Sequence, residues 1–522
     1  MQNKFFPWTK KHERILWAAV MALLPPLVCL ITCLLEGRTI ADAYLPASEW
    51  NDELIYYKMV EGMVHFGYPQ GYFGFNESHS ALFSFAAWSP VLVWPWVLWG
   101  LIFGWNLYSP YICNIVMLSL AMFLFTWLVH PTGKQKGILA FLFITFPPLT
   151  RYMLSGMPEV ICFAMVIVVL ALSISYLEKE LKRKLVLLFV LTALMTLMRP
   201  YLIVFMFFPL YFLFKKGKWA GLLADMGILA VTAAGYAMIK KYFSAEYFDP
   251  LFRTEFIDAF RYRGIWGGTK SFIRQLFNEG KEYFDILIKG FQSGLAAGAF
   301  FAGFWLVLLL LLMQTMKSFI KKEKNQTLLY GGLVLCYGAM WVALLLMYKP
   351  VEGSKHLLTF IVLGIFAISL METRFYKKMI VMAAVFIYLY SVLGEAYPYD
   401  YQIPYRDAPL EEAVAYWQQV FHEEMSLQKE DTPNFDNVVI WTLYDYDLTD
   451  NAQNMTPWQY LYGLPEGFGV NCCYPDYVTE HFEEIQSRYL VVLPGGRVEA
   501  FMEENGIVPL AERDNVILYR LR

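Results

Sequence analysis

The stretch LVLLFVLTALMTLMRPYLIVFMFFPLYFLF, residues 185–214, decides how this chain folds. It is apolar almost throughout and is interrupted once, by Arg199-Pro200. A helix that crosses a membrane needs about 20 apolar residues, so this stretch is too long for one crossing. Basic segments flank it on both sides, at 182–184 and 215–218. Because basic loops collect on the cytoplasmic side, we predict a helical hairpin that turns at Arg199-Pro200 near the outer face.

The composition is that of a membrane protein. Of 522 residues, 58% are hydrophobic and 17% are charged, whereas soluble domains are about half apolar and about a quarter charged. The formal net charge of −3 gives no reason to expect a nucleic-acid partner. Seven cysteines without regular spacing exclude a disulfide scaffold and a zinc module. For the adjacent pair Cys472-Cys473, two free thiols and a vicinal disulfide both remain open.

The chain begins with a basic segment, residues 4–14, that precedes an apolar run at 15–35. A signal peptide has a shorter apolar core of about 7–15 residues and a small-residue cleavage site, which this run lacks. We therefore expect a retained span with its N-terminus inside. Further apolar runs of spanning length lie at 109–129, 138–154, 158–177, 220–240, 293–316, 327–347, 357–371 and 379–394.

The remaining ambiguity concerns residues 81–104, which are apolar but broken by Trp88-Ser89-Pro90 and Trp94-Pro95-Trp96. All basic loops lie inside only if this stretch does not cross and the stretch 185–214 crosses twice. The loops in question are Lys134/Lys136, 179–184, 215–218, 317–324 and 374–378. The predicted fold class is an α-helical polytopic membrane protein with about eleven spans, its N-terminus inside and its C-terminus outside.

This topology divides the chain into two parts. Residues 1–394 form a transmembrane domain with outer loops at 36–108, 241–292 and 348–356, and residues 395–522 form a small extracytoplasmic domain. The second part alternates strand-like and helix-like runs, which predicts an α/β fold. The strand-like runs are 438–441, 489–493 and 516–519, and the helix-like runs are 409–427, 476–487 and 497–505.

The first outer loop carries an adjacent pair of carboxylates. The segment Glu49-Trp50-Asn51-Asp52-Glu53-Leu54-Ile55-Tyr56-Tyr57 leads into apolar residues at helical spacing. One interpretation is structural: Asn51 caps a helix, and the acids of its first turn match the helix dipole. The other is catalytic, because a membrane enzyme needs an acid–base group at such an outer position. Adjacent helical residues point about 100° apart, so at most one of Asp52 and Glu53 aims squarely into a given site.

A short N-terminal span, an outer loop with Asp52-Glu53 followed by aromatic residues, and many further spans resemble the GT-C class of glycosyltransferases. This class includes the protein O-mannosyltransferases and the aminoarabinose transferases. The resemblance covers most of the chain in architecture, while the motif match is short. It implies an inverting enzyme that moves a sugar from a polyprenyl-phosphate carrier, among membrane lipids, to an envelope glycan, lipid or protein acceptor. It also implies that Asp52 is the general base and Glu53 a supporting acid.

Such a transfer also needs positive groups, because the leaving lipid phosphate develops negative charge. The outer-facing cations are Arg151 and Arg199 at span ends, and Lys349, Lys355 and His356 in the loop 348–356. In the resembling class a basic residue of the corresponding late loop contacts the carrier phosphate, so Lys355 or His356 is the candidate. The competing interpretation is that these long side chains reach toward lipid headgroups. For Arg199, inside an Arg-Pro turn, we favour substrate binding.

Three further outer polar residues are candidates for substrate binding, namely Glu159, Glu77 and His79. Glu159 follows a proline at a predicted helix start, where it could complement the dipole or bind sugar hydroxyls. His79 by itself is more often structural. A divalent metal cofactor is compatible with the sequence, but no ligand spacing indicates one. Loop 241–292 mixes basic and aromatic residues, and we favour an amphipathic segment on the outer leaflet over a clamp on the substrate.

Two other functions fit this topology: a transporter or flippase of a lipid-linked glycan, and a non-catalytic partner in envelope assembly. Many alternating-access transporters are built on internal repeats, and none is visible here. A transporter also holds polar residues at mid-membrane depth, whereas the polar clusters of this chain lie at outer span ends. The sequence therefore favours surface chemistry, that is, a glycosyltransferase.

Overall fold

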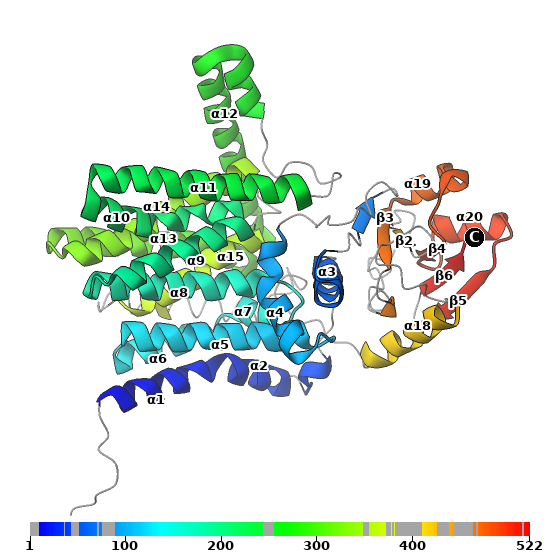
Figure 1. Ribbon diagram of the computed structural model, residues 1–522, viewed down its shortest axis with the longest axis horizontal. Helices are drawn as coiled ribbons and strands as arrows, with labels where there is room; N and C mark the ends of the chain where they lie inside the picture. The colour runs from blue at the N-terminus through cyan, green and yellow to red at the C-terminus, as the bar shows by residue number, and fades with distance from the viewer. Residues whose placement is uncertain are drawn as a thin grey trace, which may run out of the picture.

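The computed structural model describes residues 10–35, 37–42, 52–69, 73–75, 89–243, 255–293, 295–347, 354–371, 377, 380–381, 410–424, 438–442, 463–465, 468–513 and 516–521. They form a bundle of helices, a small sheet with helices of its own, and helix α3 (Asp52–Phe66) between the two (Figure 1). The N-terminal helix begins at the end of the bundle remote from the sheet. The predicted helical membrane protein with a small sheet-containing unit is therefore present.

One continuous cluster of buried apolar side chains fills the bundle and extends through α3 into the sheet-containing unit. Within the described ranges, six segments are long and apolar enough to cross a membrane, and three further apolar helices are shorter. The bundle helices are α1 (Lys10–Ala22), α2 (Leu24–Leu35), α4 (Trp94–Phe103), α5 (Ser109–Val129), α6 (Gly133–Ile144), α7 (Pro147–Met153), α8 (Glu159–Glu178), α9 (Lys182–Met198), α10 (Phe207–Gly217), α11 (Trp219–Phe243), α13 (Leu295–Ile320), α14 (Lys324–Met347) and α15 (Ser354–Ser369).

The stretch 185–214 forms the predicted hairpin. Helix α9 ends at Met198, and the next residue, Arg199, has the extended backbone (φ −144°, ψ 114°) that a following proline imposes. The short 3-10 segment η3 (Pro200–Met206) and α10 then return the chain. At the open end of the hairpin, Lys215 Nζ lies 3.4 Å from Glu180 Oε1. Arg199 therefore sits at the turn, and the basic flanks lie together at the opposite end.

The N-terminal helix and the basic loops at 134–136 and 317–324 lie at that same end, and the loop 374–378 lies almost entirely outside the described residues. The Arg14 guanidinium is 3.2 Å from the His130 ring, and Lys136 Nζ lies 3.8 Å from the centre of the Trp17 ring. Asn325, at the start of α14, donates a hydrogen bond to a backbone carbonyl near the end of α8. One end of the bundle thus collects the N-terminal helix and the basic loops that the structure describes, which is the arrangement that the positive-inside rule predicts for the cytoplasmic side.

Two predicted runs differ in detail. The run 138–154 is broken into α6 and α7, because the adjacent prolines Pro147-Pro148 begin a new helix and cannot extend the preceding one. The run 379–394 lies almost entirely outside the described residues. Within the stretch 81–104, α4 has 10 residues and so covers roughly 15 Å. The apolar helix to which α4 belongs runs over Pro90–Phe103 and is shorter than the helices that could span a membrane; residues 81–88 lie outside the described residues, so the non-crossing stretch stays a prediction.

The sheet has the strand order β1-β3-β2-β4-β6-β5, with β1 to β4 parallel and β5 and β6 antiparallel additions. Three strands and two helices coincide with the predicted runs, the predicted helix 476–487 is shortened to α19, and β1, β3 and β5 were not predicted. The elements are β1 (Phe73–Phe75), α18 (Leu410–Glu424), β2 (Val438–Thr442), β3 (Gly469–Cys473), α19 (Pro475–Glu480), β4 (Tyr489–Val492), α20 (Arg497–Glu504), β5 (Pro509–Arg513) and β6 (Val516–Arg520).

Strand β1 comes from the first outer loop, not from the C-terminal part. It pairs in parallel with β3 and so forms an edge of the sheet. Helix α3 lies only a few residues before it, and Lys58 Nζ donates a hydrogen bond to the Leu464 carbonyl at 2.9 Å. Helix α3 is therefore attached to the sheet unit through both its side chains and the strand that follows it.

The loop 241–292 contains α12 (Glu255–Ser293), which projects from the side of the bundle across the direction of the long helices (Figure 1). It kinks at Gly264, whose φ of 67° is readily adopted only by glycine. Trp266, Phe277 and Ile273 are strongly exposed along it, beside basic residues of the same helix. A helix with this orientation and surface agrees with the expected amphipathic segment at a leaflet.

Cysteine labelling tests the predicted sidedness. In a cysteine-free background, Arg263→Cys on α12 and Val508→Cys in the sheet unit should react with an impermeant thiol reagent added to intact cells. Both positions are exposed. Lys182→Cys and Lys321→Cys, in the basic loops, should react only after the membrane is permeabilised. Labelling of Lys182→Cys in intact cells would contradict the topology.

Candidate active site

Helix α3 begins at Asp52, as the periodicity predicts, and is buried between the bundle and the sheet unit. Tyr56, Met59 and Val60 are almost completely shielded, and so is the charged Lys58. Lys58 Nζ contacts Glu61 Oε2 at 2.7 Å. Burial and this carboxylate hold the pKa of Tyr57 well above its ordinary value, so its hydroxyl stays protonated at neutral pH. The side chain of Asp52 itself lies outside the described residues.

Glu53 points from α3 into the bundle, where it forms a buried ion pair. Its Oε1 lies 3.6 Å from Arg151 Nη2, and both side chains are 0% exposed. Arg151 belongs to the last turn of α7. A separation of 3.6 Å is longer than the roughly 2.7–2.9 Å of a close charge-assisted hydrogen bond. The pair therefore brings two opposite buried charges together through a contact that is longer than a close hydrogen bond.

A second buried ion pair joins two residues that the sequence identified separately. Arg199, at the hairpin turn, donates a short hydrogen bond to Glu159, the first residue of α8, and both side chains are 1% exposed. Arg199 Nη1 also lies 3.1 Å from the Tyr201 hydroxyl. An arginine that reached toward lipid headgroups would be exposed at its tip, so the headgroup interpretation does not describe Arg199.

Helix α3 brings these two pairs into one region. Tyr56 follows Glu53 by about one turn on the same helix. The Tyr56 side chain lies close enough to Arg199 to interact electrostatically with it, as do Glu159 and Tyr201. On α3, Glu53 therefore contacts Arg151, and Tyr56 lies near Arg199. Two arginines and two glutamates thus lie at the end of the bundle that faces the sheet.

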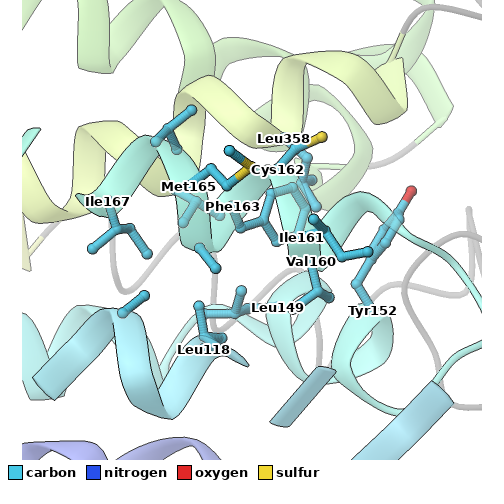
Figure 2. Packing of buried hydrophobic residues seen from close by; sticks show 14 of the residues in the cluster. Leu118, Leu149, Tyr152, Val160, Ile161, Cys162, Phe163, Met165, Ile167 and Leu358 are labelled. Carbon is cyan, nitrogen blue, oxygen red and sulfur yellow. The ribbon is translucent and has the colours of Figure 1, made fainter. Parts of the chain in front are cut away.

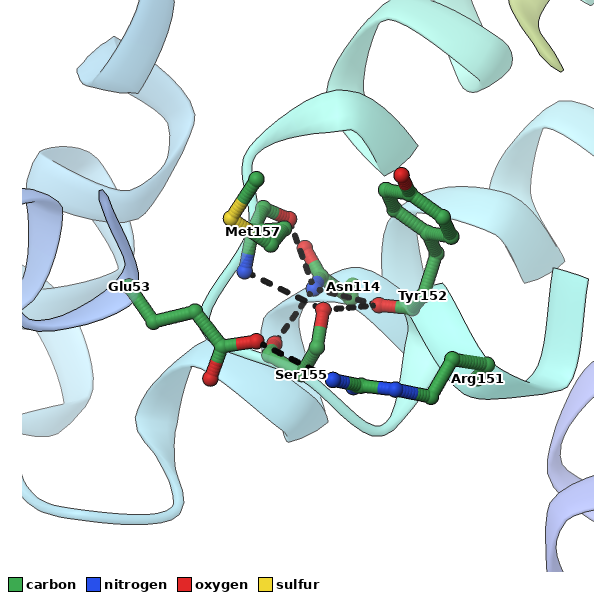
Figure 3. A network of polar contacts seen from close by, with 6 residues as sticks. All are labelled: Glu53, Asn114, Arg151, Tyr152, Ser155 and Met157. Atoms are coloured by element: carbon green, nitrogen blue, oxygen red, sulfur yellow. Dashed lines mark hydrogen bonds and ion pairs between the residues drawn. The ribbon is translucent and has the colours of Figure 1, made fainter. Parts of the chain in front are cut away.

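Asn114 of α5 holds the loop between α7 and α8 in place (Figure 3). Its side-chain amide donates to the backbone carbonyls of Tyr152, Ser155 and Met157 at 3.4, 3.1 and 3.4 Å. Its oxygen accepts from Trp96 Nε1 of α4 at 3.1 Å. This loop connects Arg151 to Glu159, so Asn114 sets the spacing between the two ion pairs. Sequence analysis missed Asn114, although a polar residue within an apolar run is a signal of such a role.

The start of α15 lies beside the start of α8. Leu358 packs close to Cys162 among the buried residues of this region (Figure 2), and the two helices are in contact. Lys355 and His356 occupy the first turn of α15, and their side chains lie outside the described residues. Because Leu358 is less than one turn away, both residues belong to the end of the bundle that holds Glu159 and Arg199.

The remaining predicted site residues, Lys349, Glu77 and His79, lie outside the described residues. Within the ranges that the structure does describe, no three His, Cys, Asp or Glu side chains gather as they would around a metal ion. The described part of the site is therefore an arrangement of carboxylates and guanidinium groups.

The chain matches no family model and no curated protein. Among solved structures it is similar to the oligosaccharyltransferase of Archaeoglobus fulgidus, at 12% identity and a TM-score of 0.44 over 94% of this chain and 70% of that one. It is also similar to ArnT from Cupriavidus metallidurans, in the apo state and bound to undecaprenyl phosphate. Those matches have 10% and 11% identity and a TM-score of 0.41, over 97% of this chain and 98% of ArnT. These neighbours are GT-C glycosyltransferases, the class that the sequence resembles.

The Glu159–Arg199 pair can be tested by a double-mutant cycle. Arg199→Met leaves the Glu159 carboxylate buried without its counter-charge, which should cost about 3–5 kcal/mol of stability. Glu159→Met should cost a similar amount, while the combined variant should recover most of the loss because no lone charge remains. The measurement is the unfolding of purified protein in detergent.

The exposed pair Lys215–Glu180 is the matched control, because both of its side chains are about half exposed. Lys215→Met should cost less than about 1 kcal/mol. If Arg199→Met proved no more costly than Lys215→Met, the burial of the Glu159–Arg199 pair would be in error.

Proposed function

We propose that this protein is a membrane glycosyltransferase that moves a sugar from a polyprenyl-phosphate carrier to an envelope acceptor at the outer face, with inversion at the anomeric carbon. The acceptor is a glycan, a lipid or a protein that presents a hydroxyl group. The observation that carries the proposal is the pairing of Glu53 with Arg151 and of Glu159 with Arg199, both buried beside the acidic helix α3. Charged groups buried at a membrane protein's end are costly and are usually retained for function.

The stability of the fold does not by itself explain why these four charged side chains are buried here. Replacing a buried ion pair by well-packed apolar residues is often neutral or stabilising. A phosphate ligand gives a better reason, because guanidinium groups bind its oxygens with two parallel hydrogen bonds. In a region from which water is excluded, such groups also stabilise charge that develops during a reaction.

In the proposed reaction Asp52 removes the proton of the acceptor hydroxyl as its oxygen attacks the anomeric carbon. The new carbon–oxygen bond forms while the bond from that carbon to the phosphate oxygen of the carrier breaks. The electron pair of the broken bond leaves with the lipid phosphate, whose added negative charge the arginines offset. Glu53 supports this step by holding Arg151 and by fixing the orientation of α3.

The two arginines have different roles in this proposal. Arg199 is hydrogen-bonded to Glu159 and Tyr201, so its guanidinium group is fixed in position. Arg151 lies 3.6 Å from Glu53 on the helix that carries Asp52, and we propose it for direct contact with the phosphate. Lys355 and His356 would add positive charge at the N-terminal turn of α15, where backbone N–H groups also favour an anion. Lys349, Glu77 and His79 remain candidates for contacts with the sugar or the acceptor.

Replacing the proposed base separates catalysis from helix capping. Asp52→Asn keeps the size of the side chain, so as a capping change it should cost less than about 1 kcal/mol. As the loss of a general base it should lower transfer roughly 10²–10⁴-fold. Asp258→Asn, an exposed acid on α12, is the matched control and should leave transfer unchanged. The proposal fails if Asp52→Asn transfers sugar like the wild type, or if its activity merely follows the amount of folded protein.

The assay compares envelope glycans of cells with and without the protein, and then of cells that carry each variant. A transferase predicts the loss of one sugar from an otherwise intact glycan. Loss of a whole polymer would instead indicate export, the function of a transporter or flippase. If cells that carry Asp52→Asn had the same envelope glycans as wild-type cells, the result would favour the alternative function, a non-catalytic partner in envelope assembly.

The leaving-group side is tested by Lys355→Ala, His356→Ala and the combined variant. Each alters the first turn of one helix, so membrane insertion and folding should be retained. The rate of transfer should fall, and a higher concentration of the lipid-linked donor should be needed to reach half of the maximum rate. Both effects follow because positive charge near the carrier phosphate is lost. Transfer at the wild-type rate in all three variants would remove this turn from the phosphate site.

A further inference from the structure

The end of the bundle opposite the candidate active site contains a polar pocket of about 470 Å³. It is formed where α8, α13 and α15 end and α14 begins, among the basic loops. Its volume lies within the roughly 300–1,000 Å³ of small-molecule sites. The polar side chains that line it include Gln314, Lys317, Lys321, Glu178, Glu323 and Gln326.

Gln314 is the buried polar group of this pocket. It is 4% exposed, and its Nε2 lies 3.3 Å from Gln326 Oε1 and 3.4 Å from the Ser318 hydroxyl. Its Oε1 is buried and accepts no hydrogen bond from the described part of the chain. A buried amide oxygen without a donor is costly, so Gln314 indicates a ligand that brings an N–H or O–H group into the pocket.

The rim of the pocket carries both signs of charge. Lys317 and Lys321 lie one turn apart on α13 and present two ammonium groups. Glu178 and Glu323 present two carboxylates. Among the described residues, neither these two acids nor Lys321 take part in an ion pair. A ligand with one anionic and one cationic group would match this rim better than a simple anion.

We propose that this pocket binds a zwitterionic phosphate ester of the ethanolamine type. The phosphate lies between Lys317 and Lys321, and the ammonium group donates to Gln314 Oε1 and to the carboxylates. The headgroup of phosphatidylethanolamine in the inner leaflet and free phosphoethanolamine share this chemistry. The site is separate from the proposed transfer reaction, because it lies at the other end of the bundle.

The full-length protein, purified in detergent, is tested by native mass spectrometry with added phosphatidylethanolamine, phosphatidylcholine or phosphatidylglycerol. Phosphatidylethanolamine should be retained in preference to the other two. Phosphatidylcholine has no N–H donor, and phosphatidylglycerol has no positive charge. Lys321→Ala and Gln314→Leu should each weaken retention about tenfold, as expected for a lost hydrogen bond to a charged group. Lys182→Gln, an exposed change at the same end but outside the pocket, should retain the lipid normally.

Competition with free phosphoethanolamine distinguishes the two ligands, the membrane lipid and the soluble ester. Displacement of the bound lipid at similar concentrations would identify the soluble ester as a ligand in its own right. Resistance to displacement would identify the membrane lipid. Equal retention of the three lipids, or unchanged retention in both pocket variants, would overturn the proposal. Lys321 is exposed, so its variant remains informative if Gln314→Leu folds poorly.

Discussion

The interaction on which the site depends is the burial of charge at the end of the bundle that faces the sheet. Arg151 and Arg199 are both enclosed by protein, and each is paired with a carboxylate, Arg151 with Glu53 and Arg199 with Glu159. An isolated buried charge is far more costly than a paired one, so the elements that carry these residues cannot move independently. Helix α3, the loop held by Asn114 and the Arg199-Pro200 turn must assemble together or not at all.

The same constraint explains why the sheet unit matters to the candidate site. Helix α3 delivers Glu53 to Arg151, and its other contacts reach Leu464 through Lys58 and β3 through the neighbouring strand β1. A displacement of the sheet would therefore be transmitted to the carboxylates of α3. In this account the C-terminal part helps to position the proposed base.

Much of the fold was predictable because it follows from local physics. The hairpin at Arg199-Pro200 and three of the strands depend on apolar length, proline and loop charge. The pairing of Glu159 with Arg199, the strand β1 and the role of Asn114 depend on contacts between segments far apart in the chain. Such contacts leave no periodic signal, and a three-residue strand such as β1 is too short to show one. Sequence analysis therefore named Glu159 and Arg199 but could not predict that they bind each other.

The central claim is that the buried arginines are retained for the phosphate of a polyprenyl carrier. The most direct measurement is the thermal unfolding of purified protein titrated with undecaprenyl phosphate, with undecaprenol as the control that lacks the phosphate. Binding to the folded state should raise the unfolding temperature of the wild type progressively. The apolar double variant Glu159→Met with Arg199→Met should fold but respond much less, and Arg151→Met should also lose the response. An equal rise in the wild type and in both variants, or an equal rise with undecaprenol, would contradict the account.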